Sequence, residues 1–371
     1  MDQSRQIELD IPGRVCLFGE HSDWAAGYRT TNPQIELGYA IITGTDQGIR
    51  VRAMCHPSKI KIQSRLPEGE RLPAVEYPLD SGHLRRSARC SGFYSYMAGT
   101  AAILLEKFDV RGVDIDNFLT DLPLQKGLSS SAAACVMTAR VFNILYDLQL
   151  DTRAEMEVAF QGELLTGSKC GRMDQGCAYG KRSILMTFDG DALRIDELTV
   201  AQPLYLLLVD LAGTKDTKAI LRALNACYPL ARNELDRNVH HYLGQVSADT
   251  TLKAVQLISC GSLDELGALM CSVQKQFDTL MRPACPDELA APRLRALLSE
   301  SKVRKLSLGG KGVGSQGDGT AQLLVRDERS QQELGHYISC KLGLSVLPLT
   351  IPASERSSCY WGSNSEGAPS S

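Results

Sequence analysis

The sequence has no excess of positive charge and no long apolar run. Its 371 residues include 40 Lys and Arg against 43 Asp and Glu, a net charge of −3, and the basic residues form no extended cluster. Nucleic acid or an anionic membrane surface is therefore not an expected partner. No apolar stretch approaches the roughly 20 residues that cross a bilayer. The start, MDQSRQIELD, also lacks the basic end and apolar stretch of a secretory signal. A cytoplasmic protein is expected.

The twelve cysteines form no C-x-x-C pair, and the sequence has no internal repeat. Structural zinc and dithiol redox chemistry both use such closely paired cysteines, so neither is expected. The nearest approach to a cluster, Cys170 and Cys177, lacks a second pair of ligands. Most of the cysteines are expected to be small core residues.

What the chain does contain is a pattern of mixed α and β elements. In the first half, the apolar pattern predicts strands at residues 7–11, 39–45 and 49–53, and the first of these is followed by a glycine-rich turn. It predicts helices at residues 95–107 and 132–148. In the second half it predicts strands at 183–188 and 204–211 and helices at 218–226, 252–258, 263–281 and 291–299. A glycine-rich loop between two strands follows. The expected fold class is α+β.

The length favours two domains. The acidic, glycine-bearing stretch DGDALRIDELTVAQP predicts a boundary near residue 195, with one domain at 1–195 and a second at 196–355. Residues 356–371 are polar and small, which predicts a disordered tail.

The segment PLQKGLSSSAAACVMTARVFNIL leads from a glycine and three serines into an apolar helix. A helix start binds anions, because its first N–H groups lack partners and its dipole is positive there. Phosphate could therefore lie against Gly127, Leu128, Ser129, Ser130 and Ser131, with positive charge from Lys126. A hydroxyl could also bind magnesium. An ordinary serine N-cap on a core helix would explain any single serine equally well.

The segment PGRVCLFGEHSDWAAG, residues 12–27, places Arg14, Glu20, His21 and Asp23 close together in the chain. Carboxylate and imidazole groups suit the hydroxyls of a polyol or sugar, Trp24 could stack on a sugar ring, and Arg14 offers a fixed charge for phosphate. Structural roles for His21 and Trp24 remain open alternatives.

The third segment, CGRMDQGCAYG, carries Asp174 eleven residues after Glu163. Phosphoryl transfer needs positioning and charge neutralisation, so one carboxylate near the attacking hydroxyl and another on magnesium is the expected pair. Asp174 could instead be a simple turn former.

Together these segments resemble the GHMP kinases. Members carry an early P-G-[RK]-V-x-L-x-G-E-H segment, a central G-L-S-S-S-A loop and a late glycine-rich loop, here LSLGGKGVGSQGDGTAQLLV. Three ordered motifs are far more specific than a lone glycine-rich one. Within the family, GRVCLFGEHSDW and CGRMDQ are most similar to the galactokinase-like sugar kinases. The resemblance implies a two-lobed fold, with an N-terminal domain like ribosomal protein S5 domain 2 and a C-terminal ferredoxin-like domain.

The resemblance also implies roles for individual residues. Asp174 would face the reacting hydroxyl as base or orienter, with Arg14 between it and the transferred phosphate. Sugar binding would involve Glu20, His21, Asp23 and Gly171. ATP phosphates would be held by residues 126–131, and Mg²⁺ would be bound by Ser131 and Glu163.

The chain departs from the galactokinase pattern in the acceptor region. Cys16 replaces an asparagine, Gln125 replaces a glycine, and the stretch after Gly27 lacks the G-G-x-V-L-P pattern. The third loop is extended, with Lys311, Gln316 and Asp318 among its glycines. Its altered charge predicts a changed acceptor.

The predicted function is transfer of the γ-phosphate of ATP to a sugar hydroxyl, forming a sugar 1-phosphate, by a monomer or homodimer. One alternative is a mevalonate-type or other non-sugar GHMP kinase, favoured by LFGEH and by LAGTKDTKAIL. An alternative of another class is a catalytically inactive, galactokinase-like ligand sensor.

Overall fold

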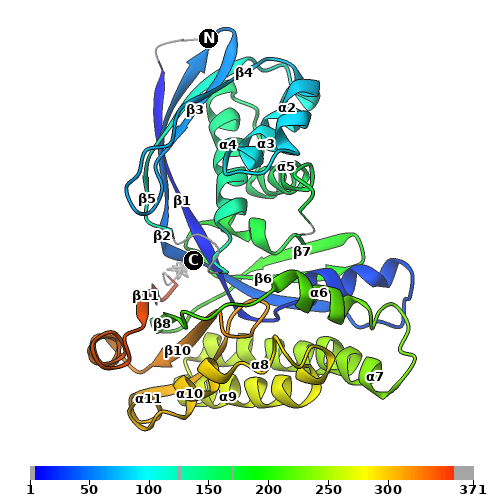
Figure 1. The fold of residues 1–371 in the computed structure, drawn as a ribbon, viewed down its shortest axis with the longest axis vertical. Coiled ribbons are helices and arrows are strands. Elements are labelled where there is room, and N and C mark those ends of the chain that lie inside the picture. Colours follow the sequence, from blue (N-terminus) through cyan, green and yellow to red (C-terminus); the bar gives the residue numbers. More distant parts are fainter. Residues whose placement is uncertain (1–4, 123–126, 169, 355–371) are drawn as a thin grey trace, which may run out of the picture.

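The computed structural model describes residues 5–122, 127–168 and 170–354, which form two β-sheets with helices packed around them (Figure 1). The first half of the chain contains, in order, β1 (Gln6–Phe18), α1 (Ser22–Ala25), η1 (Ala26–Thr30), β2 (Gly38–His56), β3 (Lys59–Ser64), β4 (Val75–Pro78), α2 (Ser81–Ala88), α3 (Tyr94–Lys107), β5 (Gly112–Thr120), α4 (Ser130–Tyr146), α5 (Thr152–Leu164), η2 (Asp174–Tyr179), β6 (Ile184–Asp189) and β7 (Ala192–Glu197).

The second half contains β8 (Leu204–Asp210), α6 (Thr217–Asn225), α7 (Glu234–His241), η3 (Tyr242–Val246), α8 (Ser247–Cys260), α9 (Leu263–Leu280), η4 (Arg282–Ala284), α10 (Pro292–Ser299), α11 (Ser301–Leu306), β9 (Ser307–Gly312), β10 (Thr320–Val325), α12 (Glu328–Tyr337), η5 (Ile338–Leu342) and β11 (Ser345–Ile351). Within the described residues, every helix is too short or too polar to cross a membrane.

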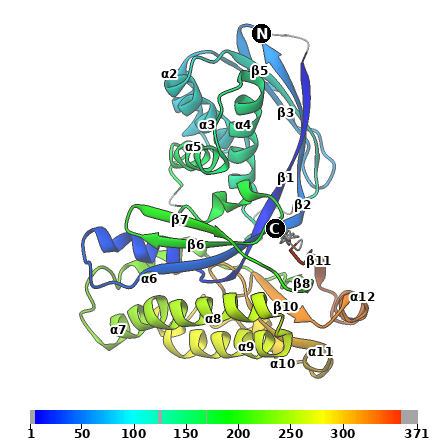
Figure 2. The same ribbon diagram turned by 180° about the vertical axis from the view of Figure 1, so that it is seen from behind.

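The first sheet is organised by the long strand β2. It has strand order β4-β3-β5-β2-β6-β7, and β1 runs antiparallel to β2 along most of its length. On its other edge, β2 pairs first with β6 and then with β5. Because β1 and β2 extend through both parts of the molecule, residues near the end of β1 reach the second half of the chain (Figures 1 and 2).

Helices α2 to α5 cover one face of the sheet (Figure 2). Two glycines allow α3 and α5 to pack closely. A Cβ atom on Gly99 would lie 2.2 Å from the carbonyl oxygen of Gly162, and one on Gly162 would lie 2.4 Å from the hydroxyl of Thr100. This packing positions the C-terminal end of α5, where Glu163 lies.

The second sheet is antiparallel with strand order β11-β8-β10-β9. Two helical connections, one after β8 and one after β10, complete a β-α-β-β-α-β arrangement of the ferredoxin-like type. Alternate residues of β8 pack into two apolar clusters: Leu206 and Leu208 belong to one, and Leu207 and Val209 to the other. Both faces are buried, which explains the unbroken apolar run in the sequence.

One apolar cluster extends from β1 to β11 and includes residues of both sheets. The predicted boundary near residue 195 falls within β7, the last strand of the first sheet, and the second sheet begins at Leu204. The division into domains at 1–195 and 196–355 stays a prediction. The predicted tail at 356–371 lies outside the described residues.

Several predicted elements need correction. The turn expected after Ile11 is absent, because β1 continues through Pro12 and Gly13 with an irregularity in its pairing. The predicted strands at 39–45 and 49–53 form the single strand β2. Strand pairing has overridden these local breaks. The helices predicted at 95–107, 132–148 and 263–281 are confirmed, with end shifts of one or two residues.

The cysteines of the described part of the chain are all unpaired. Among the eleven described cysteines, only Cys16, Cys135, Cys177 and Cys227 are buried, so the prediction that most cysteines lie in the core is wrong.

Candidate active site

The start of α4 is held against β1 by Arg14. The backbone N–H of Arg14 donates to the carbonyl of Leu128 (3.0 Å), and its Nη1 donates to the carbonyl of Gly127 (2.9 Å). Ser129 occupies the N-cap position with a left-handed φ of 57°, and its side chain makes no capping hydrogen bond. The serine-cap alternative therefore does not explain Ser129. Uncapped N–H groups remain at the helix start, where an anion can bind.

Ser131, in the first turn of α4, contacts Glu163 at the end of α5. The Ser131 hydroxyl donates to Oε1 of Glu163 (2.8 Å), and Nε2 of Gln175 donates to Oε2 (2.6 Å). Glu163 is only 2% exposed. Burial, followed by the charge of Asp174, raises the pKa of Glu163 to about 7.

The other terminal nitrogen of the Arg14 guanidinium, Nη2, pairs with Oδ1 of Asp174, the first residue of η2. Arg14 is buried, whereas the Asp174 side chain is partly exposed. Burial opposes the charge of Arg14, but the attraction of Asp174 outweighs it and raises the pKa of the guanidinium. One cation thus joins the α4 loop to an accessible carboxylate.

Asp23 in α1 lies against Gly171, which precedes η2. A Cβ atom on Gly171 would lie 1.9 Å from Oδ2 of Asp23, so only glycine fits without moving the carboxylate. Burial and the charge of Asp174 raise the pKa of Asp23 to about 6. Asp23 and Asp174 come from different sequence motifs, but their carboxylates lie close enough for the charge of Asp174 to raise the pKa of Asp23.

His21 is buried and has a left-handed φ of 70°. Its Nδ1 lies 3.1 Å from the indole Nε1 of Trp24, which can only donate, so Nδ1 is the acceptor. Burial, and then the charges of Lys215 and Lys311, lower the pKa of His21 to about 4. The neutral ring must carry its proton on Nε2, which is buried without a hydrogen-bond partner.

Trp24 itself packs edge-on against Tyr228, with ring centroids 5.5 Å apart. Tyr228 also stacks on Tyr28 and on His240. These contacts secure the segment after β1 to the region of α6 and α7, and they support the structural alternative for Trp24.

Glu20 is buried and pairs with Lys311 of β9, whose side chain has no exposed surface. The Lys311 ammonium also donates to the carbonyl of Gly312 (3.2 Å). Lys311 was expected among the glycines of the third loop, but it lies on a strand, and the loop proper comprises residues 313–319. The charge of this lysine is therefore matched within the protein.

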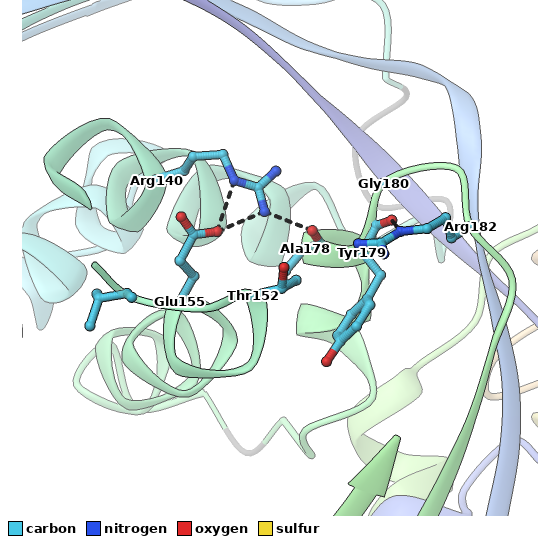
Figure 3. A pocket seen from close by; sticks show the side chains of 8 residues that line it. Arg140, Thr152, Glu155, Ala178, Tyr179, Gly180 and Arg182 are labelled. Carbon is cyan, nitrogen blue, oxygen red and sulfur yellow. Dashed lines mark hydrogen bonds and ion pairs between the residues drawn. The ribbon is translucent and has the colours of Figure 1, made fainter. Parts of the chain in front are cut away.

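A second, polar pocket is lined by residues of α4, α5, η2 and the segment after η2 (Figure 3). Arg140 of α4 pairs there with Glu155 of α5 (2.7 Å) and donates to the carbonyl of Ala178 in η2 (2.7 Å). Asn143 donates to the other oxygen of Glu155 (2.7 Å). Because the guanidinium is neutralised, the network serves to hold η2, and hence Asp174, on α4 and α5.

The arrangement of oxygen donors fits a magnesium ion. Ser131 and Glu163 present a hydroxyl and a carboxylate, and Asp174 adds a second negative charge that raises the proton affinity of Glu163. Oε1 of Gln175 is buried without a partner in the described residues. Among the residues that the structure describes, no group of three or more His, Cys, Asp or Glu side chains converges in a way that could hold a metal ion. An ion here would complete its shell with phosphate and water, as Mg²⁺ commonly does.

The structure thus brings together Arg14, Asp174 and the Gly127–Leu128 loop, and separately Ser131 with Glu163 and Asp23 with Gly171. Lys126 lies outside the described residues. The sequence predictions did not assign roles to Gln175 or Lys215. Gln175 lies in MDQ and Lys215 in LAGTKDTKAIL, two segments that the sequence analysis had already noted. Only their neighbours in space distinguish these two residues from the others in the same segments.

Comparisons with known proteins show similarity of sequence and of fold. Residues 95–181 match the GHMP kinases N terminal domain. A galactokinase of Lactobacillus helveticus is 24% identical over 357 residues, covering 86% of each chain. The crystal structure of Lactococcus lactis galactokinase complexed with galactose has a TM-score of 0.70 at 16% identity, covering 95% of this chain and 94% of that one. The Methanococcus jannaschii mevalonate kinase structure has a TM-score of 0.68 at 16% identity, covering 95% of this chain and all of that one.

The chain is similar to the GHMP kinases, and these relatives support a phosphotransferase with an alcohol group as acceptor. The curated proteins that it resembles include galactokinases of Lactobacillus helveticus and Thermococcus kodakarensis. The predicted α+β, two-lobed fold is confirmed.

Proposed function

We propose that this protein transfers the γ-phosphate of ATP to a hydroxyl of a monosaccharide and forms a sugar 1-phosphate. The observation that carries the proposal is the bridge made by Arg14, which contacts both the carbonyl of Gly127 and the carboxylate of Asp174. An anion at the start of α4 and a hydroxyl at Asp174 would lie on either side of one guanidinium. Such a placement would support in-line phosphoryl transfer, which depends on positioning the two reactants.

In this reaction the acceptor oxygen bonds to the γ-phosphorus, and the bond from that phosphorus to the β,γ-bridging oxygen breaks. ADP leaves, and the hydroxyl proton passes to Asp174 or to water. Arg14 stabilises the charge on the transferred group. Backbone N–H groups of residues 127–131 would hold the ATP phosphates. Ser131 and Glu163 would hold Mg²⁺, which neutralises phosphate charge when bound.

On the acceptor side, His21 supports the proposal through its buried Nε2–H, a donor that lacks an acceptor. A sugar oxygen would satisfy it. Asp23, positioned by Gly171, would accept a hydrogen bond from a sugar hydroxyl. Glu20 retains one carboxylate oxygen besides the one that contacts Lys311.

The test is an ADP-release assay on the purified full chain with Mg-ATP and a panel of monosaccharides, mevalonate and homoserine. We expect release to depend on a sugar, with a phosphorus NMR signal for an anomeric phosphate. Release with mevalonate alone would favour the non-sugar alternative. Binding of ATP and sugar without ADP formation would favour the inactive sensor.

A further inference from the structure

The indole of Trp24 is hydrogen-bonded to the ring of His21. Its Nε1–H donates to Nδ1 of His21 over 3.1 Å, and the two rings pack edge-on with centroids 5.8 Å apart. An indole nitrogen can only donate, whereas a neutral imidazole has one donor and one acceptor nitrogen. The contact therefore requires Nδ1 to be unprotonated and puts the ring proton on Nε2. Trp24 thus decides which nitrogen of His21 is the donor.

The other nitrogen, Nε2, is where this choice matters. His21 is 7% exposed, and its Nε2 is buried without a hydrogen-bond partner among the described residues. A buried donor without an acceptor costs free energy that a ligand oxygen would recover. In the other tautomer Nε2 would be an acceptor, and the ligand would have to offer a hydrogen instead. The tautomer therefore determines which kind of atom His21 can recognise.

The backbone of His21 is held independently of Trp24. Its carbonyl accepts from the N–H of Ala25 (3.1 Å), and the N–H of the next residue, Ser22, donates to the carbonyl of Gly19 (3.2 Å). These bonds fix the turn but not the location of the ring proton. Within the described residues, the Trp24 hydrogen bond is the one that constrains the imidazole nitrogens.

The indole is itself held in place by aromatic rings from the second half of the chain. Trp24 packs edge-on against Tyr228, with ring centroids 5.5 Å apart. Tyr228 stacks on His240 of α7 with centroids 4.0 Å apart, and Nε2 of His240 lies 2.8 Å from the carbonyl oxygen of Cys227. The direction of the indole N–H is therefore set by the segment between α6 and α7 and by α7 itself.

We propose that Trp24 is a positioning residue for acceptor recognition, which holds His21 as a donor so that the acceptor must present an oxygen lone pair to Nε2. This inference rests on the proposed sugar kinase activity and specifies how that site selects its substrate. A hydroxyl, ring or carboxylate oxygen of the acceptor would satisfy Nε2–H. A deoxy position would leave this donor unpaired.

Nitrogen NMR of the imidazole rings would measure the tautomer in the full chain without ligands, with His21→Gln to assign the signal. We expect a protonated Nε2 in the unmodified protein. Trp24→Phe keeps a ring beside Tyr228 but has no N–H donor, so both tautomers should be populated. Tyr28→Phe is the matched control, because it removes a hydrogen bond to Asn225 (3.1 Å) and keeps the stacking on Tyr228.

Two results of this measurement would contradict the inference. A protonated Nδ1 in the unmodified protein would overturn it, whether or not Trp24→Phe folds. An unaltered tautomer in folded Trp24→Phe would also overturn it. Because neither result depends on turnover, both leave the sugar kinase proposal intact.

The ADP-release assay would measure the consequence for the acceptor, with the sugar that turns over best and its monodeoxy derivatives. Trp24→Phe should lower kcat/KM for that sugar by about 10- to 100-fold, with KM for ATP unchanged. One deoxy derivative should be about 10- to 100-fold poorer than its parent in the unmodified protein, and this penalty should shrink in Trp24→Phe. Tyr28→Phe should have normal kinetics.

The double variant Trp24→Phe/His21→Gln separates positioning from packing. The glutamine amide donates whatever stands at position 24, so adding Trp24→Phe to His21→Gln should cost less than about twofold in kcat/KM. An equal cost of Trp24→Phe in both backgrounds would assign Trp24 to packing alone and overturn the inference. Turnover of no sugar by the unmodified protein would overturn the proposed function, and this inference with it.

Discussion

The ammonium of Lys311 in β9 pairs with the carboxylate of Glu20, which follows β1, and both side chains are buried. The pair joins the second sheet to the loop that also carries His21 and precedes Asp23. Its partners are 291 residues apart in the chain. The contact therefore connects the third sequence motif with the first.

Lys311→Met should destabilise the protein by about 3–5 kcal/mol, because it leaves the Glu20 carboxylate buried and unpaired. The double variant Lys311→Met/Glu20→Met should recover most of this loss. Free energies of unfolding in urea would measure both. Lys181→Met, which breaks the exposed pair with Asp46, is the matched control and should cost no more than about 1 kcal/mol. An equally small cost for Lys311→Met would contradict the importance of the buried pair.

Asp174→Asn should lower kcat by at least about 100-fold, because the amide cannot accept the proton of the acceptor hydroxyl and loses the charge that pairs with Arg14. ATP binding should be nearly unchanged, since the α4 loop contacts Arg14 through backbone carbonyls. Steady-state kinetics and ATP titration calorimetry would measure these effects. Asp191→Asn, at an exposed position, should have normal kinetics. Normal turnover in Asp174→Asn would remove this residue from the reaction.

Gly171→Ala should impair acceptor use, because the added methyl group would occupy the position of the Asp23 carboxylate. We expect kcat/KM for the acceptor to fall by about 100-fold through misplacement of that carboxylate. KM for ATP should not change. Gly27→Ala is the control, since a Cβ atom there meets nothing within 4 Å. A parallel loss in Gly27→Ala would point to a general effect of the substitution.

The low pKa of His21, about 4 against an ordinary value of 6.5, makes folding stability depend on pH. Below pH 6.5 the unfolded chain binds a proton at this residue before the folded protein does. Stability from the neutral ring is therefore present above pH 6.5 and is lost as the pH falls toward 4. The difference in unfolding free energy between the unmodified protein and His21→Gln should shrink by up to about 1.4 kcal/mol per pH unit in this range.

Urea unfolding at pH 7.5 and 5.0 would measure this change, with His241→Gln, at an exposed histidine, as the control. If the difference in unfolding free energy between the unmodified protein and His21→Gln is the same at both pH values, His21 is not held neutral by burial.

The helices α3, α4 and α9 could be predicted from the sequence because their apolar residues recur over several turns. The continuity of β1 and β2 could not, because Pro12 and Gly13 have the signature of a turn. Pairing along the length of both strands outweighs that local preference. Likewise, Lys311 stands among glycines typical of a loop, but its strand pairing with Gln322 places it in the sheet.

The sequence by itself determined the resemblance to the GHMP kinases, because it carries the early G-E-H segment, the central G-L-S-S-S-A loop and the late glycine-rich loop in a fixed order. Only the tertiary structure decided which charges are matched. Arg14 is neutralised by Asp174 and Lys311 by Glu20, whereas Lys215 has no carboxylate partner among the described residues. Charge balance depends on distances of a few ångströms between residues far apart in the chain, and local sequence patterns do not encode those distances.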